Sequence, residues 1–310
     1  MRSCDVLLVS GVEGAVLANA SGRPYVIWPF GGDLMVAAGQ FRPKLFPLRP
    51  RLTHDMLRRQ LVCAYENALC IGAHEPTALL TDFYGTEHFL RKYKVERIAI
   101  PIATRKRADR AARRQQMSRL LEDMGIRVPT RPCLGFVPSR VDYEWKGQDR
   151  LLRAFARLVR QGKAADVHLI FSGWGNDFDR AREFVREQGI GEQVTFLDYA
   201  LSKPLLHQFF SGADFVVDQF IVGMCGTSAL EAMACGAPLI TWINSSAERP
   251  WGSPPVLQAR TEEEIAVVLS DISEGRIDLD AAGARVQEWI ARNYDPRTAT
   301  SSLLAAFSRN

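Results

Sequence analysis

Short apolar runs alternate with amphipathic segments along the whole chain. Apolar runs bounded by turn residues predict strands, and segments with apolar residues three or four positions apart predict helices. In the first part this gives strands at 5–10, 25–28, 68–72 and 98–102 and helices at 12–20, 52–67 and 75–84. Strands that alternate with helices are typical of parallel sheets. We therefore expect an α/β fold.

The same alternation continues to the end of the chain, after a break at Val128-Pro-Thr-Arg-Pro132. Strands are expected at 133–137, 167–172, 194–197, 215–218 and 238–242, and helices at 148–160, 177–187, 203–211, 227–234, 262–273, 281–293 and 299–307. The break between Arg127 and Arg131 predicts a domain boundary, because proline interrupts both kinds of element. We therefore expect two Rossmann-like, doubly wound domains, at 1–130 and 131–310.

Composition and charge narrow the class of protein. The chain has 310 residues, 47% of them hydrophobic, which is enough for two domains with substantial cores. Its six cysteines form no CxxC pair, and no apolar run is long enough to span a bilayer, so we expect reduced thiols and a cytosolic protein. A net charge of +4 without a recognisable motif argues against a nucleic-acid partner.

Two basic stretches make the charge uneven, at 42–51 and 105–114. In the first, Arg42, Lys44, Arg49 and Arg51 are interleaved with Phe41, Leu45 and Phe46, a pattern that suits either peripheral contact with an anionic inner membrane face or an ordinary solvated loop. The second opens a helix and predicts a solvated helix face.

A glycine-marked segment at 223–240 carries the first candidate chemistry. Gly226, Thr227 and Ser228 stand at the start of an expected helix, where unpaired N–H groups and the helix dipole favour a phosphate. Glu231 follows one turn later, and a carboxylate suits hydroxyl groups because it only accepts hydrogen bonds. The combination indicates a nucleotide with Glu231 on the ribose. The alternative is an ordinary helix with Gly236 as its C-terminal cap.

Two cations precede that segment. Arg140 and Lys146 follow the strand at 133–137, and open α/β sheets bind ligands at the carboxyl ends of their strands. Arginine offers a planar fork and lysine a mobile charge, so together they could neutralise a diphosphate. A solvated loop with two incidental cations is the other interpretation.

Taken together, three blocks resemble the nucleotide-sugar half of the retaining family 4 (group 1) glycosyltransferases, which have the GT-B fold. They are Arg140 with Lys146-Gly147, Phe171-Ser-Gly173-Trp-Gly175, and Glu231-Ala-Met-Ala-Cys-Gly236-Ala-Pro238. The resemblance covers roughly residues 131 to 300. It implies that Arg140 and Lys146 bind the donor diphosphate, that Glu231 binds the ribose, and that the loop with Tyr199 and Ala200 holds the base.

Some positions leave alternatives open. Gly173 and Gly175 allow backbone to approach a ligand, or simply form a tight turn. Tyr199 could stack on the base or be structural. Asp33, after two glycines, could contact the acceptor or cap a helix.

The chain also departs from the family pattern. The family's donor-sugar acid, eight positions before the ribose acid, is Gly223 here, and its acceptor-side histidine is Phe30. Asp218 or Gln219 could replace the lost sugar contact. The first domain is also short by about half of a usual 150–200-residue domain. Three explanations of the short first domain stay open: it is a true minimal domain, the reading frame is incomplete, or another chain completes the domain.

We therefore expect a retaining glycosyltransferase that moves a sugar from a nucleoside diphosphate donor to a glycan or lipid-linked acceptor. Arg140, Lys146 and Asp33 are the candidate catalytic residues, and the candidate donor contacts are Gly173, Gly175, Tyr199, Ala200, Gly226, Thr227, Ser228 and Glu231. The sequence shows no carboxylate cluster beside these cations that would hold a metal. We therefore expect neither a metal nor another cofactor. The alternative is a non-catalytic nucleotide-sugar-binding subunit, and the lack of GxGxxG disfavours a dinucleotide-dependent oxidoreductase. The last helix is expected to cross back to the first domain.

Overall fold

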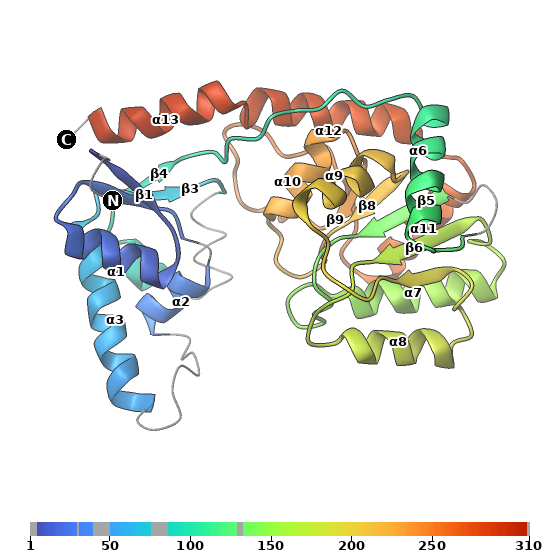
Figure 1. Ribbon diagram of the computed structural model, residues 1–310, viewed down its shortest axis with the longest axis horizontal. Helices are drawn as coiled ribbons and strands as arrows, with labels where there is room; N and C mark the ends of the chain where they lie inside the picture. Colours follow the sequence, from blue (N-terminus) through green and yellow to red (C-terminus); the bar gives the residue numbers. More distant parts are fainter. Residues whose placement is uncertain (1–4, 30, 40–49, 76–85, 129–132, 309–310) are drawn as a thin grey trace. The chain divides into compact units, whose positions relative to one another are not determined.

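A computed structural model describes residues 5–29, 31–39, 50–75, 86–128 and 133–308 (Figure 1). The chain forms two compact units. The first contains residues 1–101, 246–250 and 296–310, and the second contains residues 102–245 and 251–295. Each is built on its own parallel sheet.

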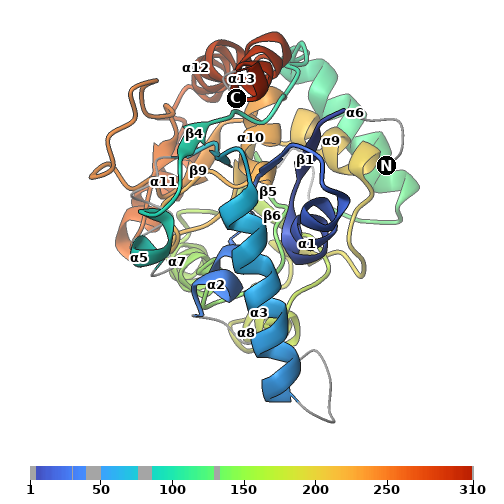
Figure 2. The same ribbon diagram turned by 90° about the vertical axis from the view of Figure 1, so that its left-hand side faces the viewer.

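The first unit has a four-stranded parallel sheet. Its strands lie side by side in chain order: β1 (Leu7–Val9), β2 (Tyr25–Ile27), β3 (Ile71–Ala73) and β4 (Val95–Arg97). The helices in its main segment are α1 (Gly11–Ser21), α2 (Gly32–Ala38), α3 (Pro50–Asn67) and α5 (Glu87–Leu90). Figure 2 shows α1 and α3 side by side, and the two helices contact each other.

The strand expected at 98–102 is wrong in its position. β4 ends at Arg97, and only the amide of Ile98 continues the pairing, by donating to the Ala73 carbonyl at 3.0 Å. The segment beyond it contains Pro101, which has no amide hydrogen for a ladder. Apolar character alone therefore placed the strand too late. The helix expected at 75–84 lies almost wholly outside the described residues.

Two segments distant in sequence complete the first unit. The last helix, α13 (Pro296–Ser308), packs Ala306 against Val26, Cys70 and Ile98, so it returns to the sheet of this unit. The segment 246–250 is tied in by Arg249, whose Nε lies 3.0 Å from Glu75 Oε2, and both side chains are buried. A buried pair of this kind is strongly destabilising to break, because the remaining charge has no compensation.

The second unit has a six-stranded parallel sheet in the order β10-β9-β8-β5-β6-β7. Its strands are β5 (Cys133–Val137), β6 (Val167–Phe171), β7 (Val194–Phe196), β8 (Phe215–Val217), β9 (Leu239–Thr241) and β10 (Leu257–Gln258). From β5 the chain builds outward through β6 and β7, and it then returns to the other side of β5 with β8. The strand order therefore reverses between β5 and β8, which is where open parallel sheets bind ligands.

Helices cover both faces of this sheet (Figure 1). One layer contains α7 (Gln148–Arg160), α8 (Phe178–Glu187) and α11 (Glu262–Ser273); the other contains α6 (Arg110–Asp123), α9 (Lys203–Gly212), α10 (Thr227–Ala234) and α12 (Leu279–Asn293). Between α7 and the sheet the core includes Leu151, Phe155 and Leu169, all without exposed surface.

The division between the units falls after Pro101, whereas the sequence predicted a boundary between Arg127 and Arg131. α6 belongs to the second unit because it packs against α9, and its buried Arg113 forms an ion pair with Asp280 at 2.8 Å. The proline-rich break lies between two elements of the same unit. A local break in pattern does not reveal which neighbours a helix will contact.

His168 makes the stability of the second unit depend on pH. It is buried in β6, with Nε2 2.8 Å from Thr195 Oγ1, and burial lowers its pKa to about 4. The unfolded chain takes up this proton near pH 6.5, so between pH 6.5 and 4 the unfolded state binds more protons. Stability is therefore fully present above pH 6.5 and falls as the pH drops to 4.

We expect His168→Gln to remove this loss, because glutamine cannot be protonated and can still bond to Thr195. Between pH 7 and pH 4 the natural protein should lose about 3 kcal/mol more unfolding free energy than the variant, at about 1.4 kcal/mol per pKa unit. Urea titrations at both pH values measure the difference. Equal losses in the two proteins would contradict this origin.

Candidate functional site

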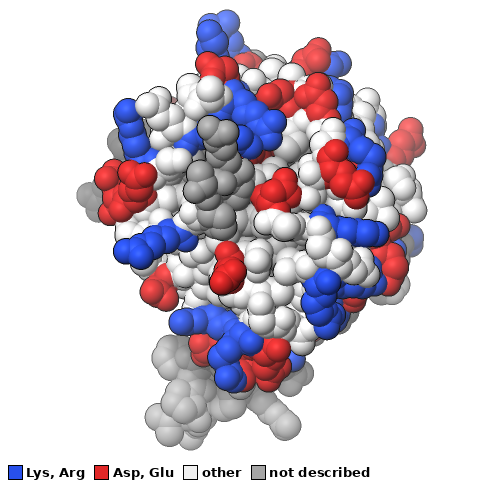
Figure 3. Space-filling view, turned by 90° about the vertical axis from the view of Figure 1, so that its right-hand side faces the viewer, with Lys and Arg blue, Asp and Glu red and all other residues white. Residues whose placement is uncertain are grey.

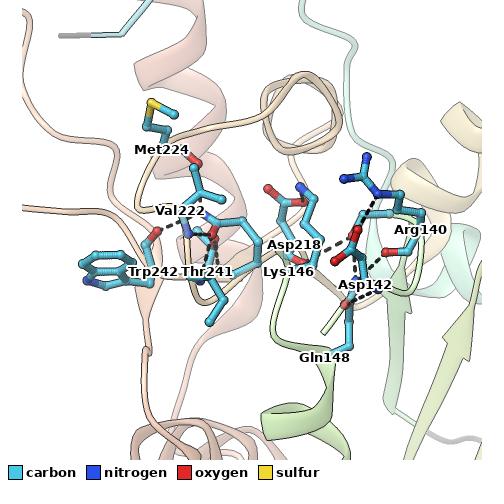
Figure 4. Close-up of polar contacts among 12 residues, drawn as sticks. Arg140, Asp142, Lys146, Gln148, Asp218, Val222, Met224, Thr241 and Trp242 are labelled. Carbon is cyan, nitrogen blue, oxygen red and sulfur yellow. Dashed lines mark hydrogen bonds and ion pairs between the residues drawn. The ribbon is translucent and has the colours of Figure 1, made fainter. Parts of the chain in front are cut away.

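The loop between β5 and α7 presents Arg140. Its Nε donates to Asp142 Oδ2 at 2.9 Å, and the two Nη atoms point away from Asp142 (Figure 4). They have no hydrogen-bond partner among the residues that the structure describes, and the side chain is 42% exposed. Arg140 is therefore held at one edge and open to a ligand at the other.

A buried glutamine fixes the shape of this loop. Gln148, with no exposed surface, donates to the Arg140 carbonyl at 2.8 Å and accepts from the Asp142 amide at 3.0 Å. Asp142 also accepts from the Trp145 amide at 3.0 Å, so both of its oxygens are used. Sequence reasoning missed Asp142, which lies between Arg140 and Lys146, and Gln148, which directly follows Gly147 as the first residue of α7.

Lys146 lies at the other end of the loop, beside Asp218. Its Nζ is 3.3 Å from Asp218 Oδ1, and the carboxylate is buried at the end of β8 (Figure 4). The reversal of strand order brings the two together, because the segments that follow β5 and β8 leave the same edge of the sheet. Neither their distance in sequence nor a motif predicts this pair.

The start of α10 adjoins the same pair. A side chain added at its N-cap, Gly226, would place Cβ 3.6 Å from Asp218 Oδ2 and 3.9 Å from Lys146 Nζ. Thr227 is exposed and Ser228 half-buried, and the amides of this first turn have no preceding carbonyl within the helix. The predicted phosphate-binding groups Lys146, Gly226, Thr227 and Ser228 thus belong to one site.

Glu231 lies one turn further along α10 and is held by α9. Lys203 donates to Glu231 Oε1, and His207 Nε2 is 3.8 Å from Oε2. Burial, and secondarily the charge of Arg105, lowers the pKa of His207, which favours its neutral form. Lys203 and His207 were missed, although their four-residue spacing on a helix could have placed them on one face.

The two glycines after β6 have a structural reason of their own. A Cβ on Gly173 would lie 1.7 Å from the Leu197 carbonyl oxygen, and one on Gly175, at φ +129°, would lie 2.2 Å from that of Val141. Both places are filled by backbone of neighbouring loops, so the expected approach to a ligand is not needed to explain either glycine. Next to them, Tyr199 and Ala200 are exposed, with Tyr199 at 49%.

Gly223, the position of the absent acid, is closed by its surroundings. It has φ +73°, and a Cβ there would lie 2.8 Å from the Trp242 ring and 2.9 Å from Asn244 Cβ. The guanidinium of Arg260 covers that ring at 4.0 Å from its centroid. A longer side chain at 223 would therefore have to displace Trp242.

Gln219 is fully occupied within the protein. Its side-chain amide donates to the Met224 and Trp242 carbonyls at 2.9 and 3.2 Å, and it accepts from the Ile221 and Val222 amides at 3.0 and 2.6 Å. The idea that Gln219 replaces the lost sugar contact is therefore wrong, because its amide shapes the loop that it would have to leave. Of the two candidates only Asp218 remains.

Asp33 is buried in the first turn of α2, in the first unit. Its Oδ2 accepts from the Gly11 amide at the start of α1 at 3.1 Å, and its Oδ1 accepts from the Leu34 amide at 2.9 Å. Both oxygens are therefore engaged by backbone amides, which disfavours an open acceptor contact. Asp33 is not the cap of the following helix either, because the N-cap of α2 is Gly31. Phe30 lies outside the described residues.

Positive charge is dispersed rather than gathered. On the face of the second unit drawn in Figure 3, Lys and Arg alternate with Asp and Glu. In the basic stretch 105–114, Arg110 and Arg113 pair with Asp214 and Asp280 at 3.4 and 2.8 Å. No described helix is both long and apolar enough to cross a bilayer. The stretch 42–51 lies almost entirely outside the described residues.

We expect Gly223→Ala to destabilise the protein by about 3 kcal/mol. The left-handed backbone costs about 1–2 kcal/mol for alanine, and crowding against Trp242 adds about 1–3 kcal/mol. Gly252→Ala is the matched control, because φ is +81° and nothing lies within 4 Å of the added Cβ, so only the backbone cost applies. Urea titration compares them, and equal losses would mean that Trp242 does not close position 223.

Known proteins resemble the part of the chain that contains this site. Residues 128–247 match the model of the family described as glycosyl transferases group 1. An uncharacterised glycosyltransferase of Methanocaldococcus jannaschii is 29% identical over 102 residues, which are 33% of this chain and 25% of that protein. The match thus spans a quarter of that relative's length.

Solved structures match over nearly the whole chain. Anabaena HepE in complex with UDP-glucose superposes with a TM-score of 0.65 at 16% identity, covering 99% of this chain and 79% of that one. The sucrose-phosphate synthase of Thermosynechococcus elongatus gives 0.69 at 16% identity, covering 98% and 73%. At this identity the likeness shows the fold. The chain has the GT-B fold of these structures, and residues 128–247 are similar in sequence to the group 1 glycosyl transferases.

Proposed function

We propose that this protein transfers a sugar from a nucleoside diphosphate sugar to a glycan or lipid-linked acceptor, with retention of configuration. The observation that carries the proposal is the convergence of Lys146 and the α10 N-terminus at the reversal of strand order, next to the loop of Arg140. The group 1 sequence match over the same residues supports it.

The three features suit a departing diphosphate. The free Nη atoms of Arg140 can take two phosphate oxygens in a planar fork, and Lys146 adds a mobile charge. The first-turn amides of α10 add fixed donors and the positive end of a helix dipole. Charge that is in place before the reaction stabilises the leaving group without reorganisation, which is usually the largest catalytic contribution. These cations would make a metal unnecessary.

The remaining donor contacts follow from neighbouring positions. Glu231 would accept hydrogen bonds from the ribose hydroxyls, with Lys203 exchanged for the ligand. Tyr199, exposed beside Gly173, is available to the base. The family resemblance suggests that the leaving phosphate takes the acceptor's proton, so that no side-chain base is required. HepE, a relative in fold alone, was solved with UDP-glucose.

A non-catalytic nucleotide-sugar-binding protein is the second candidate. The closed position 223 favours it, because the family pattern leads us to expect a donor-sugar acid there. The engagement of Asp33 by backbone amides favours it too, because Asp33 was the candidate acceptor contact. Turnover distinguishes the two. The test is transfer or hydrolysis with UDP-, GDP- and ADP-sugars, in the presence of a metal chelator. Binding of a donor without turnover by any of them would favour the second candidate.

We expect Arg140→Ala to raise the Kd for the cognate nucleoside diphosphate about tenfold to a hundredfold, as measured by titration calorimetry. A hydrogen bond to a charged group contributes about 1.5–3 kcal/mol, and about 1.4 kcal/mol is a factor of ten. Arg186→Ala is the control, because Arg186 is 74% exposed on α8 and pairs with its helix neighbour Glu183. An unchanged Kd in the Arg140 variant would refute the diphosphate site.

A further inference from the structure

Asp218 carries a buried acceptor that the protein leaves unused. The side chain is 1% exposed, and Oδ1 lies 3.3 Å from Lys146 Nζ. Oδ2 is closed to solvent and has no hydrogen-bond partner among the described residues. A buried carboxylate oxygen without a partner is costly, so a native protein that keeps one commonly has a use for it.

This oxygen faces a helix N-terminus. It would lie 3.6 Å from a Cβ at Gly226, the N-cap of the eight-residue helix α10. Lys146 and the first turn of α10 thus surround a single negative charge in the ligand-free protein. Those are the two features that would bind a phosphate, so a phosphate entering this site competes with Asp218 for Lys146.

The neighbouring acceptors are already occupied. Both oxygens of Asp142 and the carbonyl oxygen of Gln219 accept hydrogen bonds from within the protein. Position 223 has no side chain, and Trp242 and Asn244 fill its space. Glu231 Oε2 also lacks a hydrogen bond, but it lies one turn along α10 beside His207. At the first turn, Asp218 Oδ2 is the acceptor available to a ligand among the described side chains.

We infer that Asp218 accepts a hydroxyl group of the sugar attached to the diphosphate, and that it couples recognition of the two. When a diphosphate draws Lys146 away, Asp218 is uncovered and loses its counter-charge. A sugar hydroxyl that donates to Oδ2 compensates this loss, whereas a bare nucleoside diphosphate cannot. The site therefore favours the intact donor over the nucleoside diphosphate product. This inference rests on the proposed function.

Asp218→Asn tests the coupling, because asparagine has the same shape without the charge. Calorimetry compares UDP with UDP-glucose, and then GDP with GDP-mannose and ADP with ADP-glucose, on the full chain. In the variant we expect the nucleoside diphosphate to bind several-fold more tightly, since Lys146 is released. We expect the sugar conjugate to bind about tenfold more weakly, as for the loss of one charge-assisted hydrogen bond.

Asp142→Asn is the matched control. It is also a buried carboxylate beside a candidate phosphate-binding cation, but both of its oxygens are occupied within the loop. We expect this variant to raise the Kd of the nucleoside diphosphate and the Kd of its sugar conjugate by a similar factor. If Asp218→Asn also weakened the binding of both ligands equally, Asp218 would only position Lys146, and the inference would be overturned. An unchanged Kd for both ligands would overturn it as well.

A second measurement uses the natural protein and so does not depend on the variant folding. Single-deoxy analogues of the sugar in the cognate donor are compared with the donor itself. At least one analogue should bind about tenfold more weakly, close to the nucleoside diphosphate alone. Uniformly tight binding of all the analogues overturns the inference. Failure of the natural protein to bind any of the three pairs would overturn the proposed function as well, which separates the two failures.

Discussion

The reversal of strand order between β5 and β8 is the constraint on which the candidate site depends. Because the chain returns to the other side of β5 after β7, the segments after β5 and β8 meet at one edge of the sheet. Lys146 and Asp218 are 72 positions apart in sequence, and only this topology brings them to 3.3 Å. The same reversal places the start of α10 beside them. Without it, the loop of Arg140 and Lys146 and the start of α10 would lie over separate parts of the sheet.

Two buried glutamines give the loops at this edge their shape. Gln148 bonds to both ends of the turn that presents Arg140. Gln219 bonds to three backbone groups of the loop that leads to α10 and to the Trp242 carbonyl just after β9. Each amide satisfies backbone groups that would otherwise be buried without partners. Neutral amides suit this task, because they supply donors and acceptors next to charged residues without adding a charge.

Much of the second unit was predictable from the sequence, because several of its helices are strongly amphipathic and its first two strands are five residues long. The helices at 148–160, 227–234 and 262–273 are found at those positions. The rule for open sheets directed attention to Arg140 and Lys146 after β5, whose phosphate-binding role stays a prediction. The side-chain partners were not predictable. Spacing does not show that Trp242 fills the place beside Gly223, or that Glu231 pairs with Lys203, since both depend on packing between segments remote in sequence.

The first unit was harder to predict for a different reason. Its described strands are only three residues long, and its core includes Ala306 of α13. Residues 246–250 also belong to this unit, so part of it comes from late in the chain. Short strands carry little periodic signal, which explains why β4 was placed too late. The engagement of Asp33 was not predictable either, because its bond to the Gly11 amide depends on how α1 and α2 pack together.

A common electrostatic principle links the charged residues of the site. Arg140, Lys146 and Glu231 each have a counter-charge in the ligand-free protein, namely Asp142, Asp218 and Lys203. Like charges close together at this edge of the sheet would repel each other, and burying an unpaired charge costs desolvation free energy. Pairing each charge therefore stabilises the protein when no ligand is bound. The partners differ in what a ligand must do. Asp142 leaves the Nη atoms of Arg140 free, and Lys203 is 63% exposed and can turn to solvent. Asp218 is buried and cannot leave, so a ligand that takes Lys146 must itself replace the lost interaction.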